Sequence, residues 1–154
     1  MNSELGPLVA RPPATPDEWE RYYKFRWRIL RAPWAQPPGS EKDDREHDSI
    51  HVALWERSGA PVAAGRVQLN SANEAQVRFM AVDPAWTRKG LGSRILKELE
   101  ERALGMGAQV VVLNSRQEAQ EFYRRHGYEL TGEAKTLFGT IPHVRMRRVL
   151  SDIR

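Results

Sequence analysis

A basic, glycine-rich segment at residues 83–93 constrains the fold of this chain more than any other feature of its sequence. The segment follows a strand-like run at residues 76–82 and leads into apolar residues at helical spacing. Leu91, Ile95 and Leu99 mark the buried face of that predicted helix. A strand, a tight turn and a helix therefore follow one another directly, as in the first half of a strand–helix–strand unit that packs its helix on a sheet.

The same segment predicts a binding site for a phosphate group. Gly90 and Gly92 have no Cβ, so a ligand can approach their backbone closely. The N–H groups of the first helical turn lack partners within the helix, and together with the helix dipole they attract an anion. Arg88 and Lys89 add positive charge. The spacing matches neither a nucleotide P-loop nor a dinucleotide fingerprint, and an ordinary connection whose glycines only ease a turn is the alternative.

A second motif follows the apolar run Val110–Leu113, which is typical of a buried strand in a parallel pair. Ala119, Phe122 and Tyr123 fall on one face of a short predicted helix, which Gly127 ends as a C-cap. Taken alone, Phe122 and Tyr123 fit a pair of packed core aromatics better than a functional site. The order of the two motifs, and their separation by one strand–helix–strand unit, favour a functional interpretation.

Together, the two motifs resemble motifs A and B of the GNAT family, the Gcn5-related N-acetyltransferases. The first is a strand, Val-Asp-Pro, an aromatic residue and a basic Gly-x-Gly turn before a helix, and the second is Ala-x-x-Phe-Tyr-x-x-x-Gly-Tyr. The resemblance covers roughly residues 51–150 and is most specific at residues 82–93 and 119–128. Thr87 stands where the family usually has Gln or Arg, which removes one side-chain contact with phosphate.

The resemblance implies that the chain binds acetyl-CoA and transfers its acetyl group to a primary amine. In the family, two central parallel strands splay apart, the pantetheine arm enters between them, and the glycine turn binds the pyrophosphate. Backbone N–H groups at residues 80–82 would polarise the thioester carbonyl, and Tyr123 would protonate the departing thiolate. The cofactor contacts that the resemblance implies are Met80, Ala81, Val82, Arg88, Lys89, Gly90, Leu91, Gly92, Ser93, Asn114 and Phe122.

The whole chain predicts one α/β (α+β) domain over residues 1–154, with a mostly antiparallel, twisted mixed sheet and helices on both faces. Thr15 is the predicted N-cap, and Pro16 the first residue, of a helix that ends near Arg31. The expected strands are residues 8–11, 50–56, 62–69, 76–82, 110–113, 128–131 and 143–150.

The attacking amine needs a base, because a lysine-like amine has a pKa of about 10.4 and arrives protonated. Many relatives carry a carboxylate on the strand that here spans residues 76–80, and this chain has none there. Loops at residues 35–48 and 135–142 are expected to set the acceptor. The acidic stretch at residues 41–48 is either a solvated loop or a wall of that site, and an acidic rim would suit a polyamine, an aminoglycoside or a protein amino group. The base candidates are Glu41, Asp44, His47, His51 and His143.

Composition bounds the remaining possibilities. The chain of 154 residues has no cysteine, which excludes disulfides, thiolate metal sites and a cysteine acyl-enzyme. No spacing of histidines and carboxylates resembles a metal site, so no metal is expected. No signal peptide and no apolar run long enough to span a bilayer are visible. The lack of cysteine points to a cytoplasmic location. Residues 26–34, 64–67 and 141–146 look like the ElaA-like branch of the family, whose relatives are often homodimers.

Three alternatives stay open. Residues 28–48 together with Arg66 are faintly similar to acyl-homoserine lactone synthases, which would need a deep apolar tunnel. A basic face that binds nucleic acid is the second alternative. The net charge of +4 equally suits anionic coenzyme A, and we expect no nucleic-acid partner. The arginines of that face are Arg124, Arg125, Arg145, Arg147 and Arg148. A GNAT fold that binds coenzyme A without catalysis is the third alternative.

Overall fold

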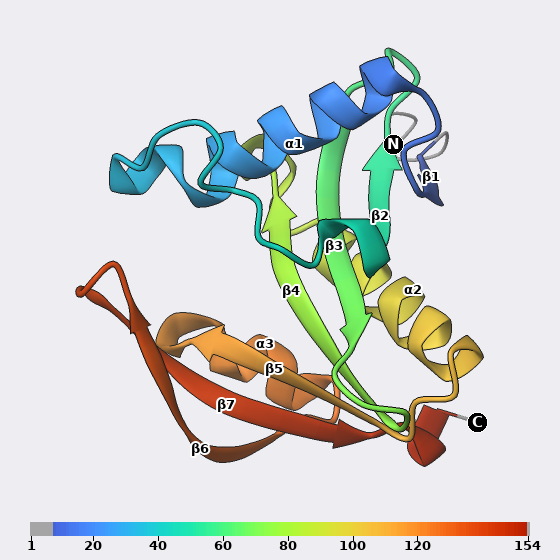
Figure 1. The fold of residues 1–154 in the computed structure, drawn as a ribbon, viewed down its shortest axis with the longest axis vertical. Helices are drawn as coiled ribbons and strands as arrows, with labels where there is room; N and C mark the ends of the chain where they lie inside the picture. Colours follow the sequence, from blue (N-terminus) through green and yellow to red (C-terminus); the bar gives the residue numbers. More distant parts are fainter. Residues whose placement is uncertain (1–7, 154) are drawn as a thin grey trace.

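The computed structural model describes residues 8–153, which form one seven-stranded sheet flanked by three α-helices (Figure 1). Across the sheet the strands are ordered β1-β2-β3-β4-β5-β7-β6. In chain order the elements are β1 (Val9–Arg11), α1 (Pro16–Leu30), β2 (Ile50–Trp55), β3 (Pro61–Leu69), β4 (Glu74–Val82), α2 (Leu91–Gly105), β5 (Val110–Arg116), α3 (Gln120–Arg125), β6 (Glu129–Leu137) and β7 (Ile141–Val149).

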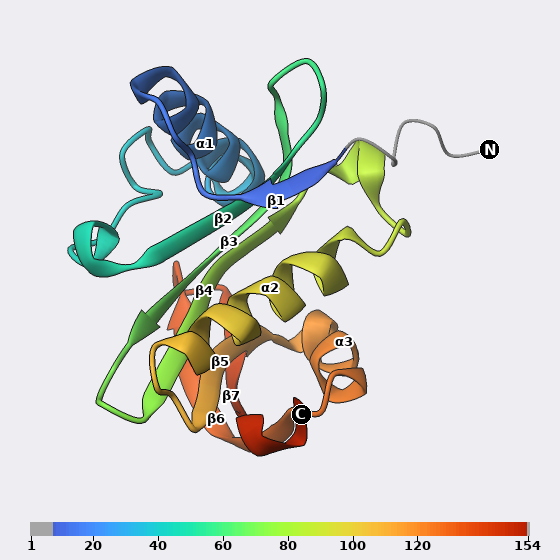
Figure 2. The ribbon, with the colours of Figure 1, turned by 90° about the vertical axis from the view of Figure 1, so that its right-hand side faces the viewer.

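The sheet is mixed, because β4 and β5 are parallel whereas the other neighbouring strands are antiparallel. Figure 2 shows α1 on one face of the sheet and α2 and α3 on the other. The expected fold class is confirmed, including the central unit of β4, α2 and β5. Within residues 8–153, no helix combines the length and the apolar character needed to cross a bilayer.

Helix α1 begins as its sequence predicts. Thr15 Oγ1 accepts a hydrogen bond from the Glu18 N–H at 3.1 Å, and Pro16 lies in the first turn, where its missing N–H would have no helical partner. Tyr22 and Phe25 are buried on the side that packs against the sheet. This packing places the C-terminal end of α1 over the open side of β4 (Figure 1).

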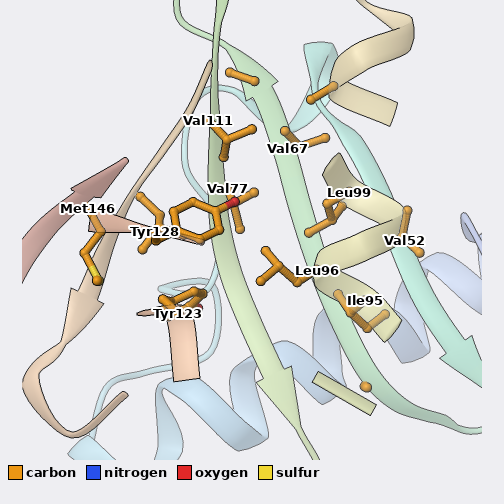
Figure 3. Packing of buried hydrophobic residues seen from close by; sticks show 14 of the residues in the cluster. Val52, Val67, Val77, Ile95, Leu96, Leu99, Val111, Tyr123, Tyr128 and Met146 are labelled. Atoms are coloured by element: carbon orange, nitrogen blue, oxygen red, sulfur yellow. The ribbon is translucent and has the colours of Figure 1, made fainter. Parts of the chain in front are cut away.

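The larger hydrophobic core lies between α2 and the sheet. Ile95, Leu96 and Leu99 of α2 are fully buried and face Val67 and Val77 of the strands (Figure 3). A side chain of this kind contributes about 1.5–3 kcal/mol when it is fully buried. The core therefore fixes α2, and with it the glycine turn at its N-terminus, firmly against β3 and β4.

Strands β4 and β5 separate after a short paired stretch. Pairing runs from Glu74 with Val110 to Val77 with Leu113 and then stops, and beyond this point the strands diverge in a V (Figure 1). The splaying that the family resemblance implies is therefore present.

A bulge in β4 lies where the two strands diverge. Phe79 and Met80 together oppose the single residue Gly65 of β3, and Phe79 has a left-handed φ of 59°. A bulge of this kind bends a strand and increases its twist. The bend therefore turns the end of β4 away from β5.

The C-terminal hairpin differs from the prediction. The prediction of a loop over residues 135–142 is wrong, because β6 continues to Leu137 and β7 begins at Ile141, which leaves only a tight turn between them. The strand predicted at residues 128–131 is likewise too short. Phe138 and Gly139 form this turn with left-handed φ values of 54° and 71°. Because β6 is an exposed edge strand, its sequence lacks the alternation of apolar and polar residues that marks a half-buried strand.

Candidate active site

The V between β4 and β5 holds a cleft of about 400 Å³. Its walls come from β4, β5, the C-terminal end of α1, the start of the α3 region and the β6–β7 hairpin. Pairing with β5 ends at Val77, so the edge of β4 that faces the cleft has backbone groups that no neighbouring strand uses. A ligand in the cleft can therefore form strand-like hydrogen bonds with residues 79–82.

The glycine turn at the N-terminus of α2 has the geometry of an anion site. Arg88 and Gly90 have positive φ values of 63° and 76°, and Gly90 is an N-cap with no side chain to bond the first helical N–H groups. A Cβ on Gly90 would meet nothing within 4 Å, so the space beside this N-cap is open. The first turn of α2 contains no acidic residue, and Arg88 and Lys89 are exposed beside it. An anion here meets two cations and the positive end of the helix dipole.

Contacts with α3 fix this end of α2. A Cβ on Gly92 would lie 3.3 Å from Phe122 Cζ, so the glycine lets the two helices approach closely. His126 Nδ1 lies 2.8 Å from the Phe122 carbonyl oxygen, and because a carbonyl oxygen only accepts, Nδ1 carries the proton of the neutral ring. Nε2 is then an acceptor, and Ser93 Oγ donates to it at 2.9 Å. The side chain of Leu91 is buried in the core. Leu91 and Ser93 therefore offer a ligand chiefly their backbone N–H groups.

Tyr123 lines the cleft from α3. It is only 8% exposed, and its ring packs edge-on against Phe122 and Tyr128 with centroids 5.0 Å and 5.8 Å away. Its hydroxyl has no hydrogen-bond partner in the part of the chain that the structure describes. Burial raises the pKa of Tyr123, so the hydroxyl stays protonated near neutral pH and can donate a proton into the cleft.

Comparison with known proteins identifies the family of the chain. The sequence pattern of the Acetyltransferase (GNAT) family matches residues 19–128. The chain belongs to the GNAT family. An uncharacterized N-acetyltransferase of Bacillus subtilis, YjcF, is 31% identical over 112 residues, which are 73% of this chain and 79% of that protein.

Solved structures share the fold of this GNAT domain. An aminoglycoside 6′-N-acetyltransferase complexed with coenzyme A has a TM-score of 0.77 at 14% identity, over 92% of this chain and 97% of that chain. Escherichia coli ElaA has a TM-score of 0.74 at 15% identity, over 92% of this chain and 97% of its own. At these identities the likeness shows the fold alone, so membership of the ElaA-like branch stays a prediction.

The residues predicted as cofactor contacts for this GNAT chain extend from the cleft along β4 to the N-terminus of α2. Met80 and Asn114 line the cleft from its two strands, as does Tyr123 from α3. Ala81 and Val82 continue along β4 beyond the cleft. The remaining predicted contacts are Arg88, Lys89, Gly90, Leu91, Gly92, Ser93 and Phe122, at the turn and at the contact of α2 with α3.

One of the five base candidates lines the cleft. His143 does so from β7, and its Nδ1 lies 2.9 Å from the Ile141 carbonyl oxygen. In the neutral ring Nδ1 therefore carries the proton, and Nε2 keeps a free lone pair. Glu41 is buried outside the cleft, where its Oε1 accepts a hydrogen bond from the Gly39 N–H at 2.7 Å. Asp44 is exposed and also lies outside the cleft.

The other two base candidates, His47 and His51, line a separate hollow of about 620 Å³ beside α1 and the start of β2. His51 Nε2 donates to the Glu46 carbonyl oxygen at 2.8 Å, and Tyr22 Oη donates to His51 Nδ1 at 2.9 Å. Burial lowers the pKa of His51 and keeps the ring neutral. Among residues 8–153, histidine, aspartate and glutamate side chains form no group of three that could hold a metal ion.

The acidic stretch at residues 41–48 does not form a wall of the cleft. Asp43 and Glu46 turn inward and bind the guanidinium groups of Arg66 and Arg26, which are both fully buried. Buried guanidinium groups require such partners, because an unpaired charge in the interior is very costly. No aspartate or glutamate is among the lining residues of the cleft. The second of the two alternatives for this stretch, an acidic wall of the acceptor site, is therefore not found at this cleft.

The arginines of the alternative nucleic-acid-binding face do not share one surface. Arg145 and Arg148 lie on opposite faces of β7, because side chains alternate along a strand. Arg145 Nη1 donates to Asn114 Oδ1 at 3.0 Å, and Arg148 Nη1 binds the buried carboxylate of Glu100 at 3.1 Å. Arg145 and Arg148 therefore serve separate contacts within the domain.

Sequence reasoning missed the cationic side of the cleft. Its members come from the C-cap of α1 and from β4, β5 and β6, so no local pattern links them. They are Arg31, Arg78, Arg116 and Lys135. The left-handed backbone of Phe79 was also missed, since it follows from the bulge and has no signal in the sequence.

Proposed function

We propose that this chain transfers an acetyl group from acetyl-CoA to the nitrogen of a primary amine, by direct attack while both substrates are bound. The observation that carries the proposal is the cleft, where the free edge of β4 and the protonated hydroxyl of Tyr123 meet. The coenzyme A in the aminoglycoside 6′-N-acetyltransferase of the same fold supports acetyl-CoA as the donor.

The binding site for acetyl-CoA extends from the glycine turn into the cleft. The N–H groups at the start of α2, assisted by Arg88 and Lys89, bind the pyrophosphate. The backbone of residues 80–82 pairs with the amides of the pantetheine arm, since this edge of β4 has no strand partner. Asn114 and Phe122 flank the arm from β5 and α3.

Once the amine has lost its ammonium proton, its neutral form attacks, and the transfer then needs two proton movements, for each of which the cleft has a residue. The amine nitrogen attacks the thioester carbonyl carbon, so a C–N bond forms as the C–S bond breaks. A backbone N–H near Met80 stabilises the charge that develops on the carbonyl oxygen. His143 Nε2 accepts the proton lost by the amine nitrogen, and Tyr123 donates its hydroxyl proton to the departing sulfur and regains one from solvent.

Calorimetric titration with acetyl-CoA, followed by an assay of thiol release with amines, tests this proposal. Gly90 is the site for a matched pair of variants, because its φ of 76° suits Asn and Asp better than other residues and its surroundings are open. Gly90→Asp and Gly90→Asn differ by one negative charge at nearly equal size. We expect Gly90→Asp to weaken binding more than about tenfold relative to Gly90→Asn, because the carboxylate repels the pyrophosphate.

Equal affinities of the two variants would place the pyrophosphate elsewhere. The absence of acetyl-CoA binding to the natural chain, at concentrations up to the millimolar range, would overturn the proposed function as a whole.

A further inference from the structure

The cleft carries positive charge that the acetyl transfer does not use. Its cationic lining residues, apart from His143, are Arg31, Arg78, Arg116 and Lys135. Arg78 and Arg116 have carboxylate partners, Asp43 at 2.8 Å and Glu118 at 3.0 Å. Within residues 8–153, neither Arg31 nor Lys135 has such a partner. Because no carboxylate lines the cleft itself, this charge is directed at whatever enters it.

Arg31 is fixed in position at the end of α1. Its Nε donates to the Ser40 carbonyl oxygen at 2.9 Å, and its Nη1 donates to the Leu30 carbonyl oxygen at 3.2 Å. The guanidinium carbon lies 5.5 Å from the ring centroid of Phe79 and 5.3 Å from that of Phe138. These contacts orient the guanidinium and leave Nη2 without a partner in the described part of the chain. The group is therefore preorganised for a ligand.

Other arginine side chains lie close to Arg31, around the ring of Phe79. The guanidinium carbons of Arg26 and Arg78 lie 4.2 Å and 4.8 Å from the centroid of the Phe79 ring, over which Arg31 also lies. Burial lowers the pKa of Arg31, the charges of Arg78 and Arg26 lower it further, and the charge of Glu41 acts in the opposite direction without reversing the shift. An anion beside Arg31 would relieve this repulsion, and a planar guanidinium suits carboxylate and phosphate oxygens in particular.

This cationic side is separate from the expected site of the coenzyme A phosphates. Arg31 follows α1 on one face of the sheet, whereas the glycine turn starts α2 on the opposite face (Figure 2). None of residues 88–93 lines the cleft. An anion bound at Arg31 therefore belongs to the second substrate and not to the donor.

We propose that the acceptor amine carries a carboxylate or phosphate group, which Arg31 and Arg78 bind on the α1 side of the cleft. This inference rests on the proposed acetyl transfer and names the class of its acceptor. An anionic acceptor takes the place of the cationic acceptors that an acidic rim would suit. Asp43 and Glu46 of the acidic stretch form ion pairs with buried arginines and are not available to a cationic amine. The anionic group anchors the acceptor while its amine nitrogen attacks the thioester, and the proton of the nitrogen passes to His143.

Matched pairs of amines test the proposal with the full chain and acetyl-CoA. Phosphoethanolamine with ethanolamine, and glucosamine 6-phosphate with glucosamine, differ by a phosphate, and β-alanine with β-alaninamide differs by a carboxylate. Spermidine and kanamycin represent cationic acceptors. We expect kcat/KM to be at least about tenfold higher for the anionic member of one pair or more, as for a charge-assisted hydrogen bond. The pairs that show the difference distinguish carboxylate from phosphate.

Variants of Arg31 then show whether this residue causes the preference. Arg31→Gln should reduce it about tenfold by raising KM for the anionic amine, and Arg31→Lys should retain part of it. Both should leave the dissociation constant for acetyl-CoA within about twofold, because the donor phosphates bind elsewhere. Arg57→Gln, in the exposed turn between β2 and β3, is the matched control and should change neither quantity.

The proposal is overturned if the cationic or uncharged amines are preferred throughout, or if the preference for anionic amines survives Arg31→Gln. If acetyl-CoA binds but no amine is acetylated, the same amines are titrated into protein saturated with coenzyme A. Tighter binding of the anionic members then supports the proposal, and equal binding overturns it. Failure of the proposed function is recognised separately, since in that case acetyl-CoA itself does not bind.

Discussion

Arg66 of β3 donates a forked pair of hydrogen bonds to Asp43, from Nη1 to Oδ1 at 2.6 Å and from Nη2 to Oδ2 at 3.0 Å. Arg78 donates to the same carboxylate at 2.8 Å. This carboxylate is therefore paired with buried Arg66 and with Arg78 of the cleft wall, and it is not available to an incoming amine. Asp43 therefore does not supply the negative charge that its acidic neighbours in the sequence suggest for the acceptor site.

Replacing Asp43 by Asn should destabilise the domain in a pH-dependent manner. Partial burial acts to raise the pKa of Asp43, but the hydrogen bonds from Arg66 and from the Arg45 N–H lower it from 3.8 to about 2. A lowered pKa in the folded state gives stability that is present above pH 4 and is lost as the pH falls towards 2. A shift of this size corresponds to about 2 kcal/mol. Asp43→Asn should lower the free energy of unfolding by about this amount at pH 7.

Urea unfolding of the natural chain and Asp43→Asn, at steps between pH 7 and pH 2, measures this difference. The difference should shrink towards zero at the acid end. Asp44→Asn is the matched control, because Asp44 is exposed and forms no ion pair within residues 8–153, and it should change stability by less than about 0.5 kcal/mol. A difference that stays constant over the whole pH range would show that the carboxylate charge is not the cause.

Local features account for what the sequence predicts correctly. The turn at residues 83–93 could be predicted because the glycines, the basic residues and the following helix are neighbours in the chain. The start of α1 at Thr15 and Pro16 follows from capping, which also involves only neighbouring residues. Strands β2, β3 and β4 carry enough buried residues to reveal their positions.

Contacts between distant segments account for what the sequence does not predict. Arg66 is separated from Asp43 by 23 positions, and the pattern of residues 41–48 contains no sign of this partner. Arg31 and Lys135 meet in one cleft only after α1 and the β6–β7 hairpin have packed around the splayed strands. The choice of His143 among the base candidates has the same origin, since only the fold decides which candidate reaches the cleft.

Replacing Tyr123 by Phe should slow the reaction far more than it weakens the binding of acetyl-CoA. The hydroxyl is the proposed proton donor to the departing sulfur, and a general acid contributes about 10²-fold or more to a rate. We expect kcat to fall by about this factor, with the dissociation constant for acetyl-CoA within about threefold. Steady-state kinetics and calorimetry measure the two quantities.

Tyr128→Phe is the control for Tyr123→Phe. Tyr128 Oη donates to buried Glu100 at 2.8 Å, so its loss should lower stability while kcat is retained. Equal kcat values for Tyr123→Phe and the natural chain would remove Tyr123 from the chemistry and leave it as a core aromatic.

Replacing His143 by Ala should remove the proposed base. We expect kcat to fall about 10²-fold near pH 7 and to recover as the pH rises, because the amine then loses its proton without help. Added imidazole should restore part of the rate in this variant. His47→Ala is the control, since His47 lines the separate hollow beside α1 and should leave the pH profile unchanged. An unaltered profile in His143→Ala would assign the base to a water molecule or to the substrate.

Replacing Gly65 by Ala should lower the stability of the domain and also change its affinity for acetyl-CoA. A Cβ at this position would lie 2.7 Å from Leu99 Cδ1, 2.8 Å from Ile95 Cγ2 and 3.0 Å from Met80 Sδ, where α2 and the bulge of β4 meet. Overpacking of this kind costs about 1–3 kcal/mol. Relief would require α2 or Met80 to move, and both contribute to the proposed acetyl-CoA site.

Thermal unfolding and calorimetry with acetyl-CoA should therefore both change in Gly65→Ala. Gly132→Ala is the matched control, because a Cβ on that glycine of edge strand β6 would meet nothing within 4 Å. Reduced stability with unchanged affinity for acetyl-CoA would mean that the strain is absorbed by Leu99 and Ile95 on the core side. In that case the bulge at Phe79 and Met80 would hold its shape independently of its packing against α2.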